Sequence, residues 1–181
     1  MKKVSYLLLI SLFTLSSAVC RAEGEPLIHN FPDMSGKGTL TWPVNYKTGV
    51  TADVTYTCTG TAATFGTYTY NSTTYVTLNM SKSDDIITLS PALEGLTKFE
   101  IYFYPDATRE TIEVYVSNDG VDWGEAITGD NRVDSKNMIR IKGLPRNNYY
   151  IQLRNKTNTA VSIHELRYYQ SSCRCLRVVI N

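Results

Sequence analysis

Apolar and polar residues alternate with a period of two along most of the chain, and this pattern limits the possible folds more than any other feature of the sequence. The clearest examples are the runs 98–104 and 111–117, whose apolar members are Phe99, Ile101, Phe103, Ile112, Val114 and Val116. Successive side chains of a β-strand point to opposite faces, so this alternation is typical of strands that bury one face. After residue 22 no stretch shows the period of an amphipathic helix. We therefore predict an all-β protein.

Roughly ten short strand-like runs follow one another after residue 39, with turn signals every 8–12 residues, as in sandwiches and jelly rolls. The 13 tyrosines agree with this class, because Tyr favours pleated, half-buried surfaces. A parallel α/β sheet would need crossover helices, for which the chain has no room. The segment 105–110 is rich in turn residues, so we expect 98–104 and 111–117 to form an antiparallel hairpin. The predicted fold class is an antiparallel β-sandwich of jelly-roll type.

The beginning of the chain has the features of a secretory signal peptide. Lys2 and Lys3 precede the apolar run 6–15, small residues follow that run, and cleavage is expected after Ala22. The alternative is lipid attachment at Cys20, which would hold the chain on a membrane surface. The apolar run is too short for a spanning helix, and nothing later resembles a transmembrane segment.

These features predict a signal peptide at 1–22 and a single β-sandwich domain at 23–181. The protein is therefore expected to be extracellular or periplasmic. Lys and Arg number 18 against 17 Asp and Glu, so the chain has no basic excess to neutralise phosphates. We do not expect nucleic acid as a partner.

Three cysteines remain after the predicted cleavage: Cys58, Cys173 and Cys175. Cys173 and Cys175 are two residues apart in an extended run, where a direct bridge would be strained. Either of them could pair with Cys58 in an oxidising compartment. A zinc site would need more ligands than these cysteines with His29 and His164, so we predict no metal site.

The sequence offers little to support an enzyme. It contains two histidines, and no nucleophile-elbow, Walker or dinucleotide-binding motif. Glu100 and Glu113 would share one face of the predicted hairpin, and paired carboxylates can hydrolyse glycosides. A solvated polar face is the favoured explanation of both residues, and we predict no catalytic residue.

Calcium is the one cation for which the sequence suggests ligands. The acidic stretch 83–85 and the loop 118–122 carry carboxylates, but neither has the spacing of an EF-hand loop. Asp-Gly pairs also form turns without metal. We therefore expect no cofactor, with Ca²⁺ as the alternative.

Tyrosines give the stronger functional signal. On the predicted hairpin, Tyr102, Tyr104 and Tyr115 share one face, and a second group surrounds a turn and consists of Tyr68, Tyr70 and Tyr75. Sugar rings present C–H faces that stack on such side chains. The alternative is that each group is half-buried beneath another strand or loop.

Two segments resemble a known family. Residues 112–123 read Ile-Glu-Val-Tyr-Val-Ser-Asn-Asp-Gly-Val-Asp-Trp, and residues 149–169 begin Tyr-Tyr-Ile-Gln-Leu-Arg and end Ile-His-Glu-Leu-Arg-Tyr-Tyr. Their order and spacing are similar to those of galactose-binding-like jelly rolls, which include discoidin (coagulation-factor type C) domains and family-32 carbohydrate-binding modules. The resemblance implies a jelly roll whose loop ends contact a ligand, with Trp123 near Asp119 among the contacts. It reports fold more than function.

We therefore expect a secreted, non-catalytic module that binds a glycan or a surface glycoprotein. The predicted ligand contacts are Tyr102, Tyr104, Tyr115, Asp119 and Trp123. The alternative is a cell-surface assembly or adhesin subunit that pairs through an exposed terminal strand at 176–180. The ligand and the oligomeric state stay open.

Overall fold

A computed structural model describes residues 27–30, 36–45, 51–90, 95–104, 111–135, 137–145 and 147–170, with the backbone alone described for 27–30, 40–45 and 51–53. The predicted signal peptide, Cys20, Cys173, Cys175 and the predicted strand at 176–180 lie outside these residues. The described strands are β1 (Leu27–Asn30), β2 (Gly38–Asn45), β3 (Thr51–Thr59), β4 (Thr64–Tyr70), β5 (Thr73–Met80), β6 (Ile86–Leu89), β7 (Leu96–Tyr104), β8 (Ile112–Ser117), β9 (Arg132–Ser135), β10 (Met138–Ile141), β11 (Tyr150–Asn155) and β12 (Val161–Gln170), with a short 3-10 helix η2 (Gly129–Asn131) before β9.

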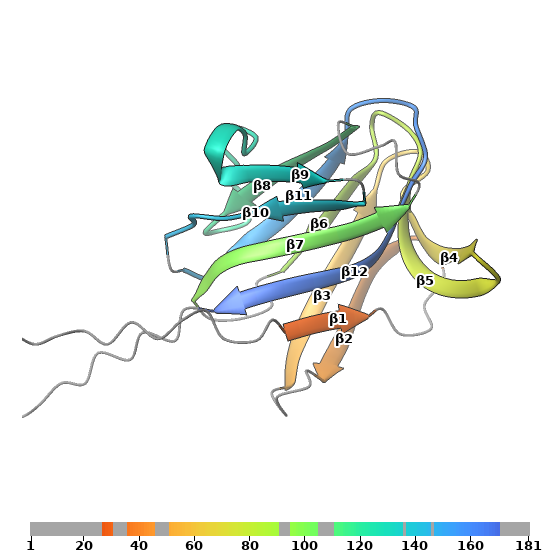
Figure 1. Cartoon of the computed structure of the whole chain (residues 1–181), viewed down its shortest axis with the longest axis horizontal. Coiled ribbons are helices and arrows are strands. Elements are labelled where there is room, and N and C mark those ends of the chain that lie inside the picture. The colour runs from red at the N-terminus through yellow and green to blue at the C-terminus, as the bar shows by residue number, and fades with distance from the viewer. Residues whose placement is uncertain are drawn as a thin grey trace, which may run out of the picture.

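Two antiparallel sheets pack face to face, as Figure 1 shows with the larger sheet in front. The seven-stranded sheet has the order β4-β5-β12-β7-β10-β9, and β1 also pairs with β12. The five-stranded sheet has the order β2-β3-β6-β11-β8. This arrangement confirms the predicted all-β antiparallel sandwich.

The core lies between the sheets and uses the residues that the alternation marked as apolar. Phe99, Ile101 and Phe103 point inward from β7, and Ile112 and Val114 point inward from β8, all with at most 1% of their surface exposed. Each such side chain stabilises the fold by about 1.5–3 kcal/mol relative to leaving it in water. The two-residue period therefore identified the inner face of both strands correctly.

The predicted hairpin between 98–104 and 111–117 is wrong. β7 pairs with β10 and β12, whereas β8 pairs with β11 in the other sheet. Alternation decides which face of a strand is buried, but it does not decide the partner strand. The chain crosses from one sheet to the other between these two strands. Tyr102 and Tyr115 consequently lie on opposite outer faces of the sandwich.

A β-bulge interrupts β12. Its register with β7 runs Ile163↔Phe103 and then Glu165↔Tyr102, which leaves His164 as an extra residue. Ile163 is buried inward, and the bulge lets both His164 and Glu165 lie on the outer face. Bulges of this kind bend a strand and re-aim its side chains.

The hairpin of β4 and β5 turns at Asn71 and Ser72, whose φ angles are +47° and +64°. Two central residues with positive φ are the requirement of a type I′ turn, which matches the twist of the strands that it joins. The hairpin projects from one end of the sandwich and curves, in yellow in Figure 1.

Candidate ligand-binding surface

Six ring-bearing residues gather on the outer face of the seven-stranded sheet, and we call them the aromatic patch: Tyr68, Tyr70, Tyr75, Tyr102, Tyr104 and His164. Tyr104 lies at the centre. Its ring centroid is 4.5 Å from that of Tyr70 and 4.5 Å from that of His164, and both pairs are stacked with interplanar angles of 19° and 16°. The rings of Tyr68 and Tyr75 lie 5.6 and 5.7 Å from it. These separations fall in the favourable range for aromatic pairs.

The curved hairpin brings Tyr70 to this centre. β4 and β7 are separated by β5 and β12, so in a flat sheet they would lie about 14 Å apart at a spacing of ~4.8 Å per strand. Stacking of Tyr70 on Tyr104 therefore requires the hairpin to curl over the outer face. Tyr68 lies directly opposite Tyr75 in the hairpin register, so both follow the same curve.

The aromatic patch faces solvent and carries no net charge at neutral pH. Tyr70 is 39% exposed, and the other members are half-buried. Burial lowers the pKa of His164 below its ordinary value of 6.5; the Glu165 charge opposes this effect and the Arg167 charge adds to it. Burial raises the pKa of Tyr104, as do the neighbouring Tyr75 and Tyr70. The surface thus presents neutral rings with hydroxyl groups.

A row of charged side chains borders the aromatic patch, and we call Lys98, Glu100, Arg140, Glu165 and Arg167 the charged row. Glu100 is 1% exposed although it lies on an outer face. The Nε of Arg140 donates to its Oε1 at 2.6 Å, and the hydroxyl of Tyr102 donates to its Oε2 at 2.8 Å. Burial would raise the pKa of Glu100, but hydrogen bonds from Arg140, Tyr102 and Tyr169 hold it below its usual value.

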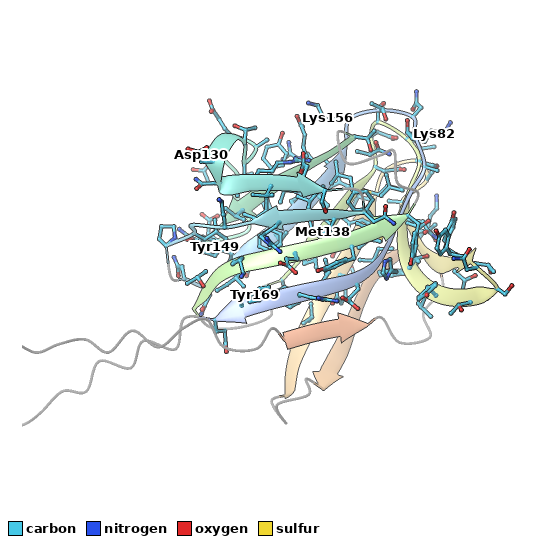
Figure 2. All side chains as sticks on the ribbon, viewed as in Figure 1. Lys82, Asp130, Met138, Tyr149, Lys156 and Tyr169 are labelled. Atoms are coloured by element: carbon cyan, nitrogen blue, oxygen red, sulfur yellow. The ribbon has the colours of Figure 1, made fainter. Side chains whose placement is uncertain are left out.

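Tyr102 connects the aromatic patch to the charged row. The guanidinium of Arg167 lies 4.3 Å from its ring centroid, and the Nε of Arg167 donates to Glu165 at 2.5 Å. Burial and the charge of Glu100 raise the pKa of Tyr102 to about 12, so it stays a hydrogen-bond donor. Figure 2 shows Tyr169, at the end of β12, and Met138, on β10, on this same face.

The structure separates Tyr115 from Tyr102 and Tyr104. On the five-stranded sheet, the guanidinium of Arg154 lies 3.9 Å from the Tyr115 ring, and the Tyr115 hydroxyl donates to Glu113 at 2.9 Å. Lys156 also pairs with Glu113, at 3.0 Å. Because Glu100 and Glu113 lie on opposite outer faces, they cannot act together on one glycosidic bond, and their predicted pairing is wrong.

Asp119 and Trp123 lie in the loop after β8, away from the aromatic patch. The Oδ1 of Asp119 accepts hydrogen bonds from the Ser117 hydroxyl at 2.8 Å and from the backbone N–H groups of Val121 and Asp122 at 2.8 and 2.9 Å. The backbone hydrogen bonds, with that from Ser117, lower the pKa of Asp119 to about 2. Asp119 and Trp123 line a shallow cavity of about 460 Å³ together with Tyr149. Asp119 thus stabilises the turn, and its Oδ1 already accepts three hydrogen bonds from the protein.

The carboxylates that suggested calcium have protein donors. Asp85 is fully buried, with Oδ1 accepting from the backbone N–H groups of Ala62 and Ala63 and Oδ2 from those of Ser81 and Lys82, all at 2.7–2.8 Å. The neighbouring Asp84 accepts from Thr61. Within the described ranges, no group of three or more His, Cys, Asp or Glu side chains is placed to hold a metal ion.

Cys58 is buried and carries a free thiol in the described part of the chain. Burial and the charge of Asp85 raise the pKa of the thiol to about 12. Since Cys173 and Cys175 lie outside the described residues, the disulfide pairing stays a prediction.

The fold and this surface define a β-sandwich protein with a solvent-facing aromatic patch. No protein-family model and no curated protein matches the chain. Among solved structures it is similar to a chain from work on glycan recognition in the Ruminococcus flavefaciens cellulosome, with 17% sequence identity, coverage of 82% of this chain and 97% of that one, and a TM-score of 0.40. A likeness at this level assigns neither a family nor a ligand. The residues described by the structure include no helix with the length and apolar character needed to cross a membrane.

Sequence reasoning missed five members of this surface: Lys98, Arg140, His164, Glu165 and Arg167. His164 had a signal, because Ile163 and Leu166 are apolar but three residues apart, which breaks the two-residue period and indicates a bulge. The arginines had none, since their grouping depends on which strands are neighbours. The two tyrosine groups that the sequence kept apart form one patch, without Tyr115.

Proposed function

We propose that this protein is an extracellular, non-catalytic module that binds glycans through the aromatic patch. The stacking of Tyr70 and His164 around Tyr104, on the solvent side of a sheet, carries the proposal. Contiguous exposed apolar surface on a soluble domain typically marks a binding site. Tyrosine rings offer apolar faces for the C–H faces of sugars, and their hydroxyls can fix sugar orientation.

The galactose-binding-like jelly-roll family is part of this proposal. Its support is the two-layer sandwich and the turn at Ser117, Asp119 and Gly120, which has the internal hydrogen bonds that such a turn motif requires. The predicted signal peptide at 1–22 supports the extracellular location. In the alternative, lipid attachment at Cys20 would hold the same module on a membrane surface. Neither cofactor nor metal enters the proposed binding.

Titration of a glycan panel into the purified protein tests the proposal. We expect Tyr70→Ala to weaken binding by about tenfold, which corresponds to ~1.4 kcal/mol. Tyr70 is the best residue to change because it is the most exposed member of the patch, so its removal should leave the melting temperature within a few degrees. Tyr115→Ala, on the opposite sheet, is the matched control and should bind normally.

Two results would contradict the proposal. One is the absence of binding to every neutral and acidic glycan of the panel at millimolar concentration. The other is binding that Tyr115→Ala weakens and Tyr70→Ala does not, which would move the site to the five-stranded sheet.

A further inference from the structure

The charged row has a geometry of its own beside the aromatic patch. In the strand register Arg167 on β12 lies opposite Glu100 on β7, and Glu100 lies opposite Arg140 on β10. With ~4.8 Å between neighbouring strands, the Cα atoms of the two arginines are about 10 Å apart, on either side of Glu100. Tyr102, which stacks under Arg167, belongs to the aromatic patch. The aromatic patch and the charged row are therefore contiguous, and one ligand can contact both.

The solvent side of the row is cationic. The side chains of Arg140 and Arg167 are 39% and 32% exposed, whereas their partners Glu100 and Glu165 are 2% and 16% exposed. The carboxylates thus lie beneath the guanidinium groups. Lys98 adds a third positive charge, held 3.7 Å from the Tyr169 ring centroid. An approaching ligand meets cations, although the row contains two carboxylates.

The guanidinium groups are held in place and still have donors to offer. In Arg140 and Arg167 alike, the Nε donates to a carboxylate, at 2.6 and 2.5 Å. A guanidinium has five N–H donors, and among the described residues the terminal nitrogens of these two have no hydrogen-bond partner. Their planar forks match the two oxygens of a carboxylate. Because the protein already orders these side chains, binding costs less side-chain entropy.

We propose that Arg140 and Arg167 bind the carboxylates of an acidic glycan, so that the ligand class is a uronic-acid polysaccharide. This inference rests on the proposed glycan-binding function and names its ligand. The neutral ring faces of the sugar stack on the aromatic patch, and its carboxylates meet the charged row. The two arginines, rather than any general positive charge, provide the selectivity, because the whole chain is nearly neutral.

The test compares two polymers that differ only in the group at C6: polygalacturonate, with a carboxylate, and the same polymer after its carboxyl groups are reduced to neutral hydroxymethyl groups. Alginate serves as a second polyuronate and heparin as a sulfated polymer. At low salt we expect the purified full chain to bind the polyuronates about tenfold or more tightly than the reduced polymer, and the difference to shrink as salt screens the charges.

Four variants separate this site from general electrostatics. Arg140→Gln and Arg167→Gln should each weaken polygalacturonate binding about tenfold, as expected for one lost charge-assisted hydrogen bond, and change binding of the reduced polymer by less than about twofold. Arg154→Gln is the matched control. Arg154 lies on the other sheet, its guanidinium also stacks on a tyrosine, and its Nε donates to the amide oxygen of Gln152. Arg140→Gln leaves the buried Glu100 carboxylate without its cation and can destabilise the fold. Arg140→Lys, which keeps the positive charge, is therefore measured beside it. The lysine keeps the charge without the fork and should bind with intermediate affinity.

The outcomes distinguish this inference from the function on which it rests. Equal binding of both polymers, lost in Tyr70→Ala, would overturn the acidic-ligand inference and leave glycan binding standing. Binding to none of these polymers while a glycan of the panel is still bound would overturn the acidic-ligand inference alone, and binding to no polymer and no glycan of the panel would overturn both. A clear preference for heparin over both polyuronates, or an equal loss in Arg154→Gln, would overturn carboxylate recognition by this pair of arginines.

Discussion

Asp85 is the residue on which two loops depend. Its carboxylate accepts four backbone N–H groups, two from the loop between β3 and β4 and two from the residues that follow β5. The acidic stretch that suggested a calcium ligand is instead an internal anchor. A buried carboxylate is stable here because four backbone N–H donors satisfy its two oxygens.

Replacing Asp85 tests this role. We expect Asp85→Ala to lower the free energy of unfolding by about 3 kcal/mol, because four backbone N–H groups lose their acceptor. Burial would raise the pKa of Asp85, but the four N–H groups outweigh it and lower the pKa below 3.8. A lowered pKa gives stability that is complete above the unfolded-state value and is lost as the pH falls through the folded-state value.

Denaturant unfolding between pH 7 and pH 2 measures both effects. The wild-type protein should lose stability below about pH 4, whereas Asp85→Asn should be weaker at pH 7 and show a shallower loss in acid. If the free energy of unfolding fell equally with pH in the two proteins, carboxylates other than Asp85 would determine the loss of stability in acid.

Two elements shape the candidate surface more than any single residue does. The bulge in β12 places His164 and Glu165 on the same side, and the β4–β5 hairpin carries Tyr68 and Tyr70 over the sheet. Both are departures from a regular ladder. Without the first, His164 would not stack on Tyr104, and without the second, Tyr70 would lie far from it.

Ser72 offers a test of the hairpin turn. It has a φ of +64°, where a side chain is disfavoured and glycine is not. Ser72→Gly should therefore raise the melting temperature by about 2–4 °C, the shift that ~1 kcal/mol produces in a domain of this size. Thr73→Gly, within β5, is the control and should lower the melting temperature. A drop in Ser72→Gly would mean that this turn does not hold the described conformation in solution.

At the scale of the whole molecule, the sandwich has two different outer faces. The seven-stranded sheet carries the aromatic patch and the charged row, and the five-stranded sheet carries Tyr115, Arg154 and Glu113 in separate contacts. The shared core lies between them, and its largest members include Tyr56, Phe99 and Tyr168. Because the faces do not touch, substitutions on one serve as controls for the other.

The core and the loop anchors should stabilise the fold without calcium. An ion that binds the native state and not the unfolded chain raises the melting temperature, and the rise grows with the logarithm of the ion concentration above its Kd. We expect thermal unfolding to be the same in EDTA and in millimolar calcium, because the carboxylates of Asp84, Asp85 and Asp119 already accept protein donors. Magnesium at equal ionic strength is the control. A rise in melting temperature with calcium alone would reveal a site that these contacts do not explain.

The sequence by itself determined the all-β class and the inner face of its clearest strands. Phe99, Ile101, Ile112 and Val114 are buried as predicted, because the two-residue period is a local property of a strand and needs no knowledge of its neighbours. The same reasoning failed for the hairpin of β7 and β8. Local turn chemistry cannot tell a return to the same sheet from a crossing to the other one.

Only the tertiary structure decided which residues meet on the candidate surface. Tyr70 and Tyr104 are far apart in the chain and stack because one hairpin curls, and Arg167, Glu100 and Arg140 align because β12, β7 and β10 are neighbours. Strand order and sheet curvature follow from the packing of whole faces against each other. A short stretch of sequence carries no record of that packing, so these contacts had to be found in three dimensions.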